Sequence, residues 1–282
     1  MTKEMTLSEK PAPIGIFDSG YGGLTILRDI QKRMPDRDFI YLGDNARAPY
    51  GSRSFDVVYT FTLQCVKRLF EMGCHLVILA CNTASAKALR NIQQNDLPKL
   101  DPNRRVLGII RPTVEIVGQT SQSRHIGLVG TTGTIQSKSY HMEFKKLFPD
   151  IIVTDEACPM WVPLVENNEF ESEGAEFFVR KNINELFTKD GKIDNLILGC
   201  THYPLLIETI RQAIPQGVNI ISQGGIVAES LEDYLIRHQD IAEKCTRNGN
   251  TQYFTTESAD KFNEAASIFL NKNVNATHIT LN

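Results

Sequence analysis

Two cysteines lie in matched surroundings that suit acid–base chemistry. Cys81 follows the apolar run 76–79, Cys200 follows the apolar run 196–198, and an amide or hydroxyl residue comes next in each case. Such runs are typical of buried strands in a parallel sheet, so each thiol is expected at a strand's carboxyl end, beside the free N–H groups of the next helix. A helix N-terminus favours the thiolate, which is a usable base or nucleophile. Two such thiols indicate a site that needs one on each side.

Polar residues follow both cysteines directly. Asn82 and Thr83 come after the first, and Thr201 and His202 after the second. They can cap the helices that they precede, or bind a carboxylate through side chains and backbone N–H groups. A lone histidine is usually a packed core residue. Its position two residues beyond Cys200 instead favours a role for His202 beside that thiol.

A second matched pair of segments lies upstream, at 14–20 and 126–133. Each is an apolar run that leads into a polar, glycine-containing turn and then a helix-like segment. Any α/β protein repeats strand–turn–helix units, so this pair alone would prove little. Together with the cysteine turns it predicts two α/β halves, each supplying one polar turn and one thiol turn. Ligands of open parallel sheets gather at the strands' carboxyl ends, where all four segments are expected.

The first polar turn carries Asp18 and Ser19. Its glycines do not match the dinucleotide spacing G-x-G-x-x-G, because position 25 is Thr, and a P-loop lysine is absent too. We interpret the turn as an acid and a hydroxyl held against a small ligand by close backbone approach. N-capping would be compatible with this use.

Two further segments are ambiguous on their residues alone. The polar stretch 44–51, which contains Tyr50 and Gly51, is explained by turn formation. Glu166 follows an apolar run and by itself is no better than a surface charge.

Strand and helix patterns alternate along the chain, which predicts an α/β fold of two pseudosymmetric, doubly wound domains with parallel sheets and a cleft between them. We expect a flexible leader at 1–13 and a discontinuous first domain, 14–105 plus 217–282. The second domain is expected at 106–216, with the hinge near 105 and 216. The C-terminal part is assigned to the first domain because the second repeat is complete near residue 214. A single continuous sheet is the alternative.

Composition limits the classes of partner. The 282 residues carry a formal net charge of −3 and contain no basic tract, so nucleic-acid binding has no electrostatic support. The N-terminus lacks the apolar stretch of a signal peptide, and no apolar run reaches membrane-spanning length. We therefore expect a cytoplasmic protein without a membrane partner.

The cysteine spacing argues against disulfides and metals. Six cysteines in such a chain are expected to be reduced thiols. Neither a C-x-x-C pair nor a zinc-like His/Cys cluster occurs, so a structural metal is not expected.

The motifs in combination resemble a known family. Asp18-Ser19-Gly20-x-Gly-Gly, Ala46-Arg47-x-Pro49-Tyr50-Gly51, Ala80-Cys81-Asn82-Thr83-Ala84 and the segment 198–205 are together similar to the glutamate racemases of the aspartate/glutamate racemase family. The tandem cysteine motifs are the most specific part of this resemblance, which runs from about 14 to 206 and more weakly to the end.

The resemblance implies a racemase without cofactor that interconverts L- and D-glutamate and supplies D-glutamate for peptidoglycan. It implies that Cys81 and Cys200 are the two acid/base thiols, acting on D- and L-glutamate respectively. It also implies that Asp18 and His202 support them, with Glu166 an acidic residue on the second domain's side. The protonation state of Asp18 is left open, because an anionic Asp18 would disfavour a thiolate. The implied substrate contacts are Asp18, Ser19, Tyr50, Gly51, Asn82, Thr83, Thr201 and His202.

Three segments depart from the family's usual pattern, and other functions stay open. Asn45, the segment 111–113 and the segment 222–225 differ from it, which bears on hinge packing or regulation rather than on chemistry.

A racemase for aspartate would share the thiols. A two-domain amino-acid-binding protein would share the cleft, while a single-thiol lyase would leave one cysteine turn unused. Glutamate is the expected small-molecule partner, and a homodimer is left open.

Overall fold

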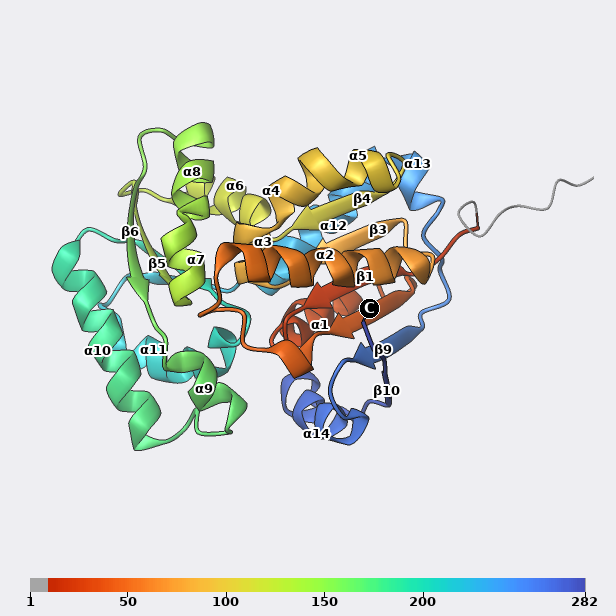
Figure 1. The fold of residues 1–282 in the computed structure, drawn as a ribbon. Coiled ribbons are helices and arrows are strands. Elements are labelled where there is room, and N and C mark those ends of the chain that lie inside the picture. The colour runs from red at the N-terminus through yellow and green to blue at the C-terminus, as the bar shows by residue number, and fades with distance from the viewer. Residues whose placement is uncertain (1–9, 282) are drawn as a thin grey trace, which may run out of the picture.

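The computed structural model describes residues 10–281 and shows two lobes, each a parallel sheet with helices on both faces (Figure 1). This confirms the predicted fold class. No helix within the described range is long and apolar enough to cross a membrane.

The first lobe holds a six-stranded parallel sheet in the order β10-β9-β2-β1-β3-β4, counted over the described residues. Its strands are β1 (Ile14–Asp18), β2 (Phe39–Gly43), β3 (Leu76–Leu79), β4 (Arg105–Gly108), β9 (Thr251–Thr255) and β10 (Ala276–His278). Alternate residues of β1 face opposite helix layers, as the two-residue period of a strand requires. Ile14 and Ile16 pack with the layer that contains α1 and α12, and Phe17 packs with the layer that contains α2.

Helices of the first lobe begin and end at recognisable signals. Ser54 caps α2 by accepting the N–H of Val57, and Gly73, with φ of +97°, follows the end of that helix. The helices are α1 (Gly23–Arg33), α2 (Phe55–Glu71), α3 (Asn82–Lys87), α4 (Leu89–Asn91), α5 (Leu97–Leu100), α12 (Gln223–Arg237), α13 (Gln239–Ala242) and α14 (Ala259–Leu270). Two short turns complete the set, a 3₁₀ turn at Asn45–Arg47 and a π-helical turn at Ile92–Asp96.

The second lobe holds a four-stranded parallel sheet in the order β6-β5-β7-β8, over the same described range. The strands are β5 (His125–Gly130), β6 (Ile152–Ala157), β7 (Asn195–Gly199) and β8 (Asn219–Ile221). The helices are α6 (Ile110–Thr120), α7 (Thr132–Ser137), α8 (Ser139–Leu147), α9 (Trp161–Glu166), α10 (Glu173–Lys189) and α11 (Ile207–Ala213), with a 3₁₀ turn at Tyr203–Leu206. Sequence patterns did not predict α9, which carries Glu166.

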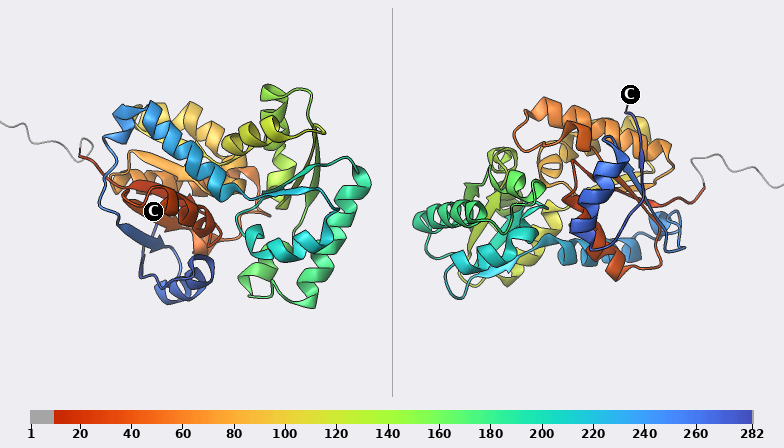
Figure 2. Two further views of the ribbon diagram at one scale, coloured as in Figure 1. Left: turned by 180° about the vertical axis from the view of Figure 1, so that it is seen from behind. Right: turned by 90° about the horizontal axis from the view of Figure 1, so that it is seen from below.

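The two lobes repeat one strand order. In the first, β2-β1-β3-β4 lie side by side, and in the second β6-β5-β7-β8 do the same. The predicted matching of the two polar turns and of the two cysteine turns therefore agrees with the topology, since β1 corresponds to β5 and β3 to β7. The strands β9 and β10 extend the first sheet beyond β2, and Figure 2 shows this C-terminal segment in dark blue against the red N-terminal elements.

The predicted domain boundaries differ from the sheets by one strand at each crossing. β4 was assigned to the second domain from residue 106, but it pairs with β3 in the first sheet. β8 was assigned to the first domain, but it pairs with β7 in the second sheet. Each is the edge strand of its sheet. The strand with which it pairs is therefore set by tertiary contacts rather than by local sequence. The chain therefore crosses between lobes after β4 and after β8.

The predicted flexible leader is wrong for its last residues. The Ala12 N–H donates to the Lys244 carbonyl at 3.0 Å, and the Ala12 carbonyl accepts the Thr246 N–H at 3.1 Å. The Lys10 carbonyl contacts His75 Nε2 at 2.9 Å. Residues 1–9 of that predicted leader lie outside the described residues.

Candidate active site

A cavity of about 200 Å³ lies between the lobes at the carboxyl ends of their central strands. Residues that follow β1, β3, β5 and β7 all line it, as expected for parallel α/β sheets. Cys81 and Cys200 both reach this one cavity, one from each lobe. A small molecule placed there would therefore be within the cavity that both thiols line.

Nearly all of the predicted site residues line the cavity. They are Ser19, Tyr50, Gly51, Cys81, Asn82, Thr83, Glu166, Cys200, Thr201 and His202. Asp18 is the exception. It is buried behind the turn, where its Oδ2 accepts the Gly20 N–H at 2.9 Å and its Oδ1 has no hydrogen-bond partner among the described residues. Burial raises the Asp18 pKa, and nearby His202 partly offsets this effect.

Cys81 is the N-cap residue of α3, as its sequence context predicted. Its sulfur accepts the Ala84 N–H at 3.4 Å and lies 3.3 Å from Ser19 Oγ. The expected thiolate is not favoured, however. Burial, followed by the charge of Asp18, raises the Cys81 pKa to about 12 in spite of these two donors. Cys81 is therefore a protonated thiol at neutral pH.

Cys200 has a different environment. A turn and then a 3₁₀ helix follow it, rather than the α-helix that the sequence suggested. Its sulfur lies 3.8 Å from His202 Nδ1, and His202 Nε2 lies 3.1 Å from Glu166 Oε1. Burial by itself would lower the His202 pKa, but the contacts with Cys200 and Glu166 outweigh it and raise this pKa to about 10. His202 is thus a buried cation beside the second sulfur.

Two predicted substrate contacts have their side-chain polar groups already engaged. The Tyr50 hydroxyl donates to the buried Asp44, which also accepts from Arg47 Nε at 2.7 Å. The Asn82 amide is bonded to Gln223 and Tyr140. Both residues line the cavity, but the Tyr50 hydroxyl and both polar atoms of the Asn82 amide already have partners within the protein.

Sequence reasoning missed several cavity-lining residues in both lobes. Thr131 caps α7 and lies 3.0 Å, hydroxyl to hydroxyl, from Thr83 of the first lobe. Its place after β5 matches that of Ser19 after β1, so the internal repeat could have identified it. The other missed lining residues are Ala48, Pro49, Ser52, Thr132, Cys158, Pro159, Val162 and Pro163.

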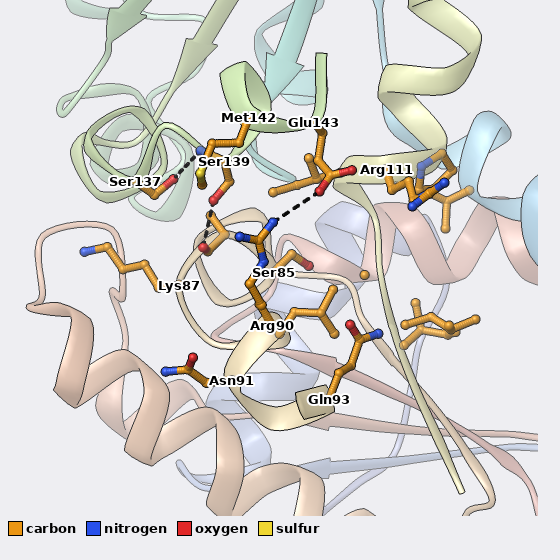
Figure 3. A pocket seen from close by; sticks show the side chains of 18 of the residues that line it. Ser85, Lys87, Arg90, Asn91, Gln93, Arg111, Ser137, Ser139, Met142 and Glu143 are labelled. Atoms are coloured by element: carbon orange, nitrogen blue, oxygen red, sulfur yellow. Dashed lines mark hydrogen bonds and ion pairs between the residues drawn. The ribbon is translucent and has the colours of Figure 1, made fainter. Parts of the chain in front are cut away.

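A larger cavity of about 1230 Å³ lies at the far end of α3 and contains none of the predicted site residues (Figure 3). Arg90 and Glu143 extend toward each other across it, with 3.7 Å between their charged atoms. Ser139 Oγ donates to the Ala86 carbonyl at 2.8 Å. These contacts join the two lobes on the side away from the thiols.

A small cavity between two like lobes, lined by Cys81 from one and Cys200 from the other, is suited to acid–base chemistry on a small molecule. The sequence matches the Asp/Glu/Hydantoin racemase family over residues 23–231. The chain belongs to this family, and it is a racemase, an isomerase by reaction class.

Relatives and solved structures agree with this assignment. The glutamate racemase of Roseobacter denitrificans is 39% identical over 271 residues, which cover 93% of this chain and 97% of that protein. The glutamate racemase of Streptococcus uberis is 36% identical over 270 residues, 95% of this chain and 98% of that protein. A crystal structure of a glutamate racemase isoform from Bacillus anthracis superposes with a TM-score of 0.87 at 33% identity, covering 96% of this chain and 98% of that one. The structure of glutamate racemase from Francisella tularensis in complex with D-glutamate superposes with a TM-score of 0.83 at 30% identity, covering 96% of this chain and 97% of that one. The family predicted from the motifs is thus confirmed.

Proposed function

We propose that this protein interconverts L- and D-glutamate with Cys81 and Cys200 as its two acid/base groups, and thereby supplies D-glutamate for peptidoglycan. The observation that carries the proposal is that one cavity is lined by Cys81 of the first lobe and Cys200 of the second, each after the corresponding strand of its sheet. The glutamate racemases among its relatives support the choice of substrate. A cytoplasmic location and a homodimer stay predictions.

The surroundings of the two sulfurs differ. Burial and the charge of Asp18 hold Cys81 protonated, whereas Cys200 lies beside His202. In the proposed mechanism Cys81 is therefore the acid, and Cys200 the base, when L-glutamate binds. Cys200 removes the Cα proton on one face while the Cys81 thiol delivers a proton to the other, and D-glutamate reacts by the reverse steps. The proposed reaction uses the two thiols and no cofactor.

The cavity offers donors for the charge that develops on the substrate. Hydroxyls of Ser19, Thr131 and Thr201 line it and can bind the α-carboxylate as electron density moves onto it. Apolar side chains of Val162 and Pro163 form part of its wall and limit water.

Chiral analysis of the purified protein tests the proposal. We expect either pure enantiomer of glutamate to become a racemic mixture without added cofactor, and deuterium from solvent to enter at Cα. Aspartate supplied in parallel is expected to react much more slowly. Faster turnover of aspartate would reassign the substrate, and glutamate binding without Cα exchange would indicate a binding protein instead.

Removing the thiols tests their roles. A general acid or base contributes about 10²–10⁴-fold to the rate, so Cys81→Ala with Cys200→Ala is expected to abolish detectable Cα exchange. Cys245→Ala is the matched control, because Cys245 is also buried but does not line the cavity. Rapid exchange in the double variant would refute the two-thiol mechanism.

A further inference from the structure

Three buried side chains form a closed ring of hydrogen bonds behind the Cys81 helix. Asn82 Nδ2 donates to Gln223 Oε1 at 2.6 Å, and Gln223 Nε2 donates to Tyr140 Oη at 2.9 Å. Tyr140 Oη in turn donates to Asn82 Oδ1 at 2.7 Å. Donors run in one sense around the ring, so the orientation of both amides is consistent with every bond. The second Gln223 N–H reaches Thr113 Oγ1 at 2.9 Å.

The ring joins the catalytic helix to both chain crossings between the lobes. Asn82 is the first residue of α3, directly after Cys81, and Tyr140 lies on α8 of the second lobe. Gln223 is the first residue of α12, just after the crossing at β8. Thr113 lies on α6, just after the crossing at β4. Gln223 therefore lies at one crossing and bonds to Thr113 just after the other. It also bonds to Asn82 of the first lobe and to Tyr140 of the second.

Burial makes these bonds hard to replace. Asn82, Tyr140 and Gln223 are each no more than 3% exposed. When one partner of a buried hydrogen bond is removed, the other is left unsatisfied because water does not reach it. Gln223 itself does not line the cavity that holds the thiols, so any effect it has on the reaction is transmitted through its bonded partners, of which Asn82 adjoins Cys81.

We propose that Gln223 is a positioning residue that fixes Cys81 relative to the second lobe, and so sets the separation of the two thiols across the substrate. The inference rests on the proposed function. A change of about one ångström in the placement of a reacting group can lower the rate by about 10²-fold. Substrate affinity changes less, because the rest of the cavity wall still binds the substrate.

The test replaces Gln223 by methionine, which has a similar shape and cannot form the ring. For Gln223→Met we expect kcat for glutamate about 10- to 100-fold lower and KM within about threefold of wild type. Gln93→Met is the control for the substitution itself, since Gln93 is exposed and its Nε2 donates to the Val106 carbonyl at 2.7 Å rather than to a member of the ring. It is expected to lose that hydrogen bond and keep its kcat.

An isotope measurement distinguishes positioning of Cys81 from general loosening. Cys81 removes the Cα proton of D-glutamate, so its misplacement makes that step more rate-limiting. In Gln223→Met the Cα-deuterium isotope effect on kcat/KM is expected to rise for D-glutamate and to fall for L-glutamate. Loosening of the whole site would change both in the same direction.

Each outcome has one meaning. Folded Gln223→Met with kcat within twofold of wild type, or with equal isotope effects for both enantiomers, would overturn the inference. Should that variant fail to fold, Tyr140→Phe removes one ring donor at lower cost and is expected to show the same isotope asymmetry with a smaller loss of kcat. A wild-type protein that does not racemise glutamate would instead refute the proposed function.

Discussion

At the scale of single residues, the two thiols share a sequence context but not an electrostatic one. Cys81 lies beside the buried carboxyl of Asp18, which opposes its ionisation, while Cys200 lies beside His202. Contacts with Cys200 and with Glu166 raise the His202 pKa, and Glu166 acts from the other ring nitrogen. The matched motifs therefore place the two thiols in unequal surroundings.

Replacement of Glu166 by glutamine tests this assignment. The His202 pKa, about 10 with Glu166 present, is expected to fall, so activity with L-glutamate should decline at a lower pH than in wild type. The ordinary pKa of histidine is about 6.5, and the folded-state pKa of His202 is higher, so its protonation stabilises the folded protein. This contribution is fully present below pH about 6.5 and is lost as the pH rises through about 10. The stability difference between wild type and Glu166→Gln should therefore be largest near pH 6.5 and shrink toward pH 10.

Urea unfolding and pH–rate profiles measure these two effects. Glu169→Gln is the matched control, because it removes the same charge three residues further along without a contact to His202. A stability difference for Glu166→Gln that stays constant across this pH range would contradict the role given to His202.

At the scale of elements, the N-terminus of α1 is packed unusually closely against the turn after β7. A Cβ at Gly22 would lie 2.5 Å from His202 Nδ1 and would also overlap the Thr201 hydroxyl. Thr25 of the same helix donates to the Thr201 carbonyl at 3.2 Å. Glycine is therefore required at position 22 by close approach, and α1 of one lobe locates the thiol turn of the other.

Gly22→Ala is expected to separate these two elements. The overlap should cost about 1–3 kcal/mol of stability, and displacement of His202 and Cys200 should lower kcat by about tenfold or more. Gly225→Ala is the control, because nothing lies within 4 Å of its added Cβ in α12. That change should leave kcat unaltered and raise the melting temperature slightly. Equal kcat values for the two variants would argue against a locating role for α1.

At the scale of the whole molecule, one hydrophobic cluster continues through both lobes. It includes Ile14 and Leu24 of the first lobe together with Trp161 and Leu198 of the second. A shared core couples the stability of the lobes, even though each has its own sheet. The two lobes are therefore expected to fold and unfold together.

Unfolding monitored by two probes tests this coupling. Trp161 is the single tryptophan and lies buried in the second lobe, 4.7 Å from Tyr203 between ring centroids. Its fluorescence and the far-UV circular dichroism of the whole chain should therefore report the same urea midpoint. Saturating D-glutamate should move both midpoints upward together, by about 2.7 kcal/mol of stability at 100 times its Kd. Separate midpoints would show that the lobes unfold independently.

Local sequence determined much of the site. Apolar runs that end in Asp18, Cys81 and Cys200 predicted strands with functional residues at their carboxyl ends, because a buried parallel strand is a local pattern. The pairing of the two halves followed from the same pattern repeated. Family membership, too, was predicted from these short motifs and confirmed by the comparisons.

Only the tertiary structure decided which groups remain free to react. Asp44, only six residues away, occupies the Tyr50 hydroxyl. Partners distant in sequence occupy the Asn82 side chain and bring Glu166 to His202, and no local pattern encodes these distant contacts. The partners of β4 and β8 were likewise set by strand pairing across the chain. The protonation of Cys81 depends on burial by both lobes, which exists only once they are assembled. A sequence can thus place a thiol at the end of a strand, but its charge follows from what the fold packs around it.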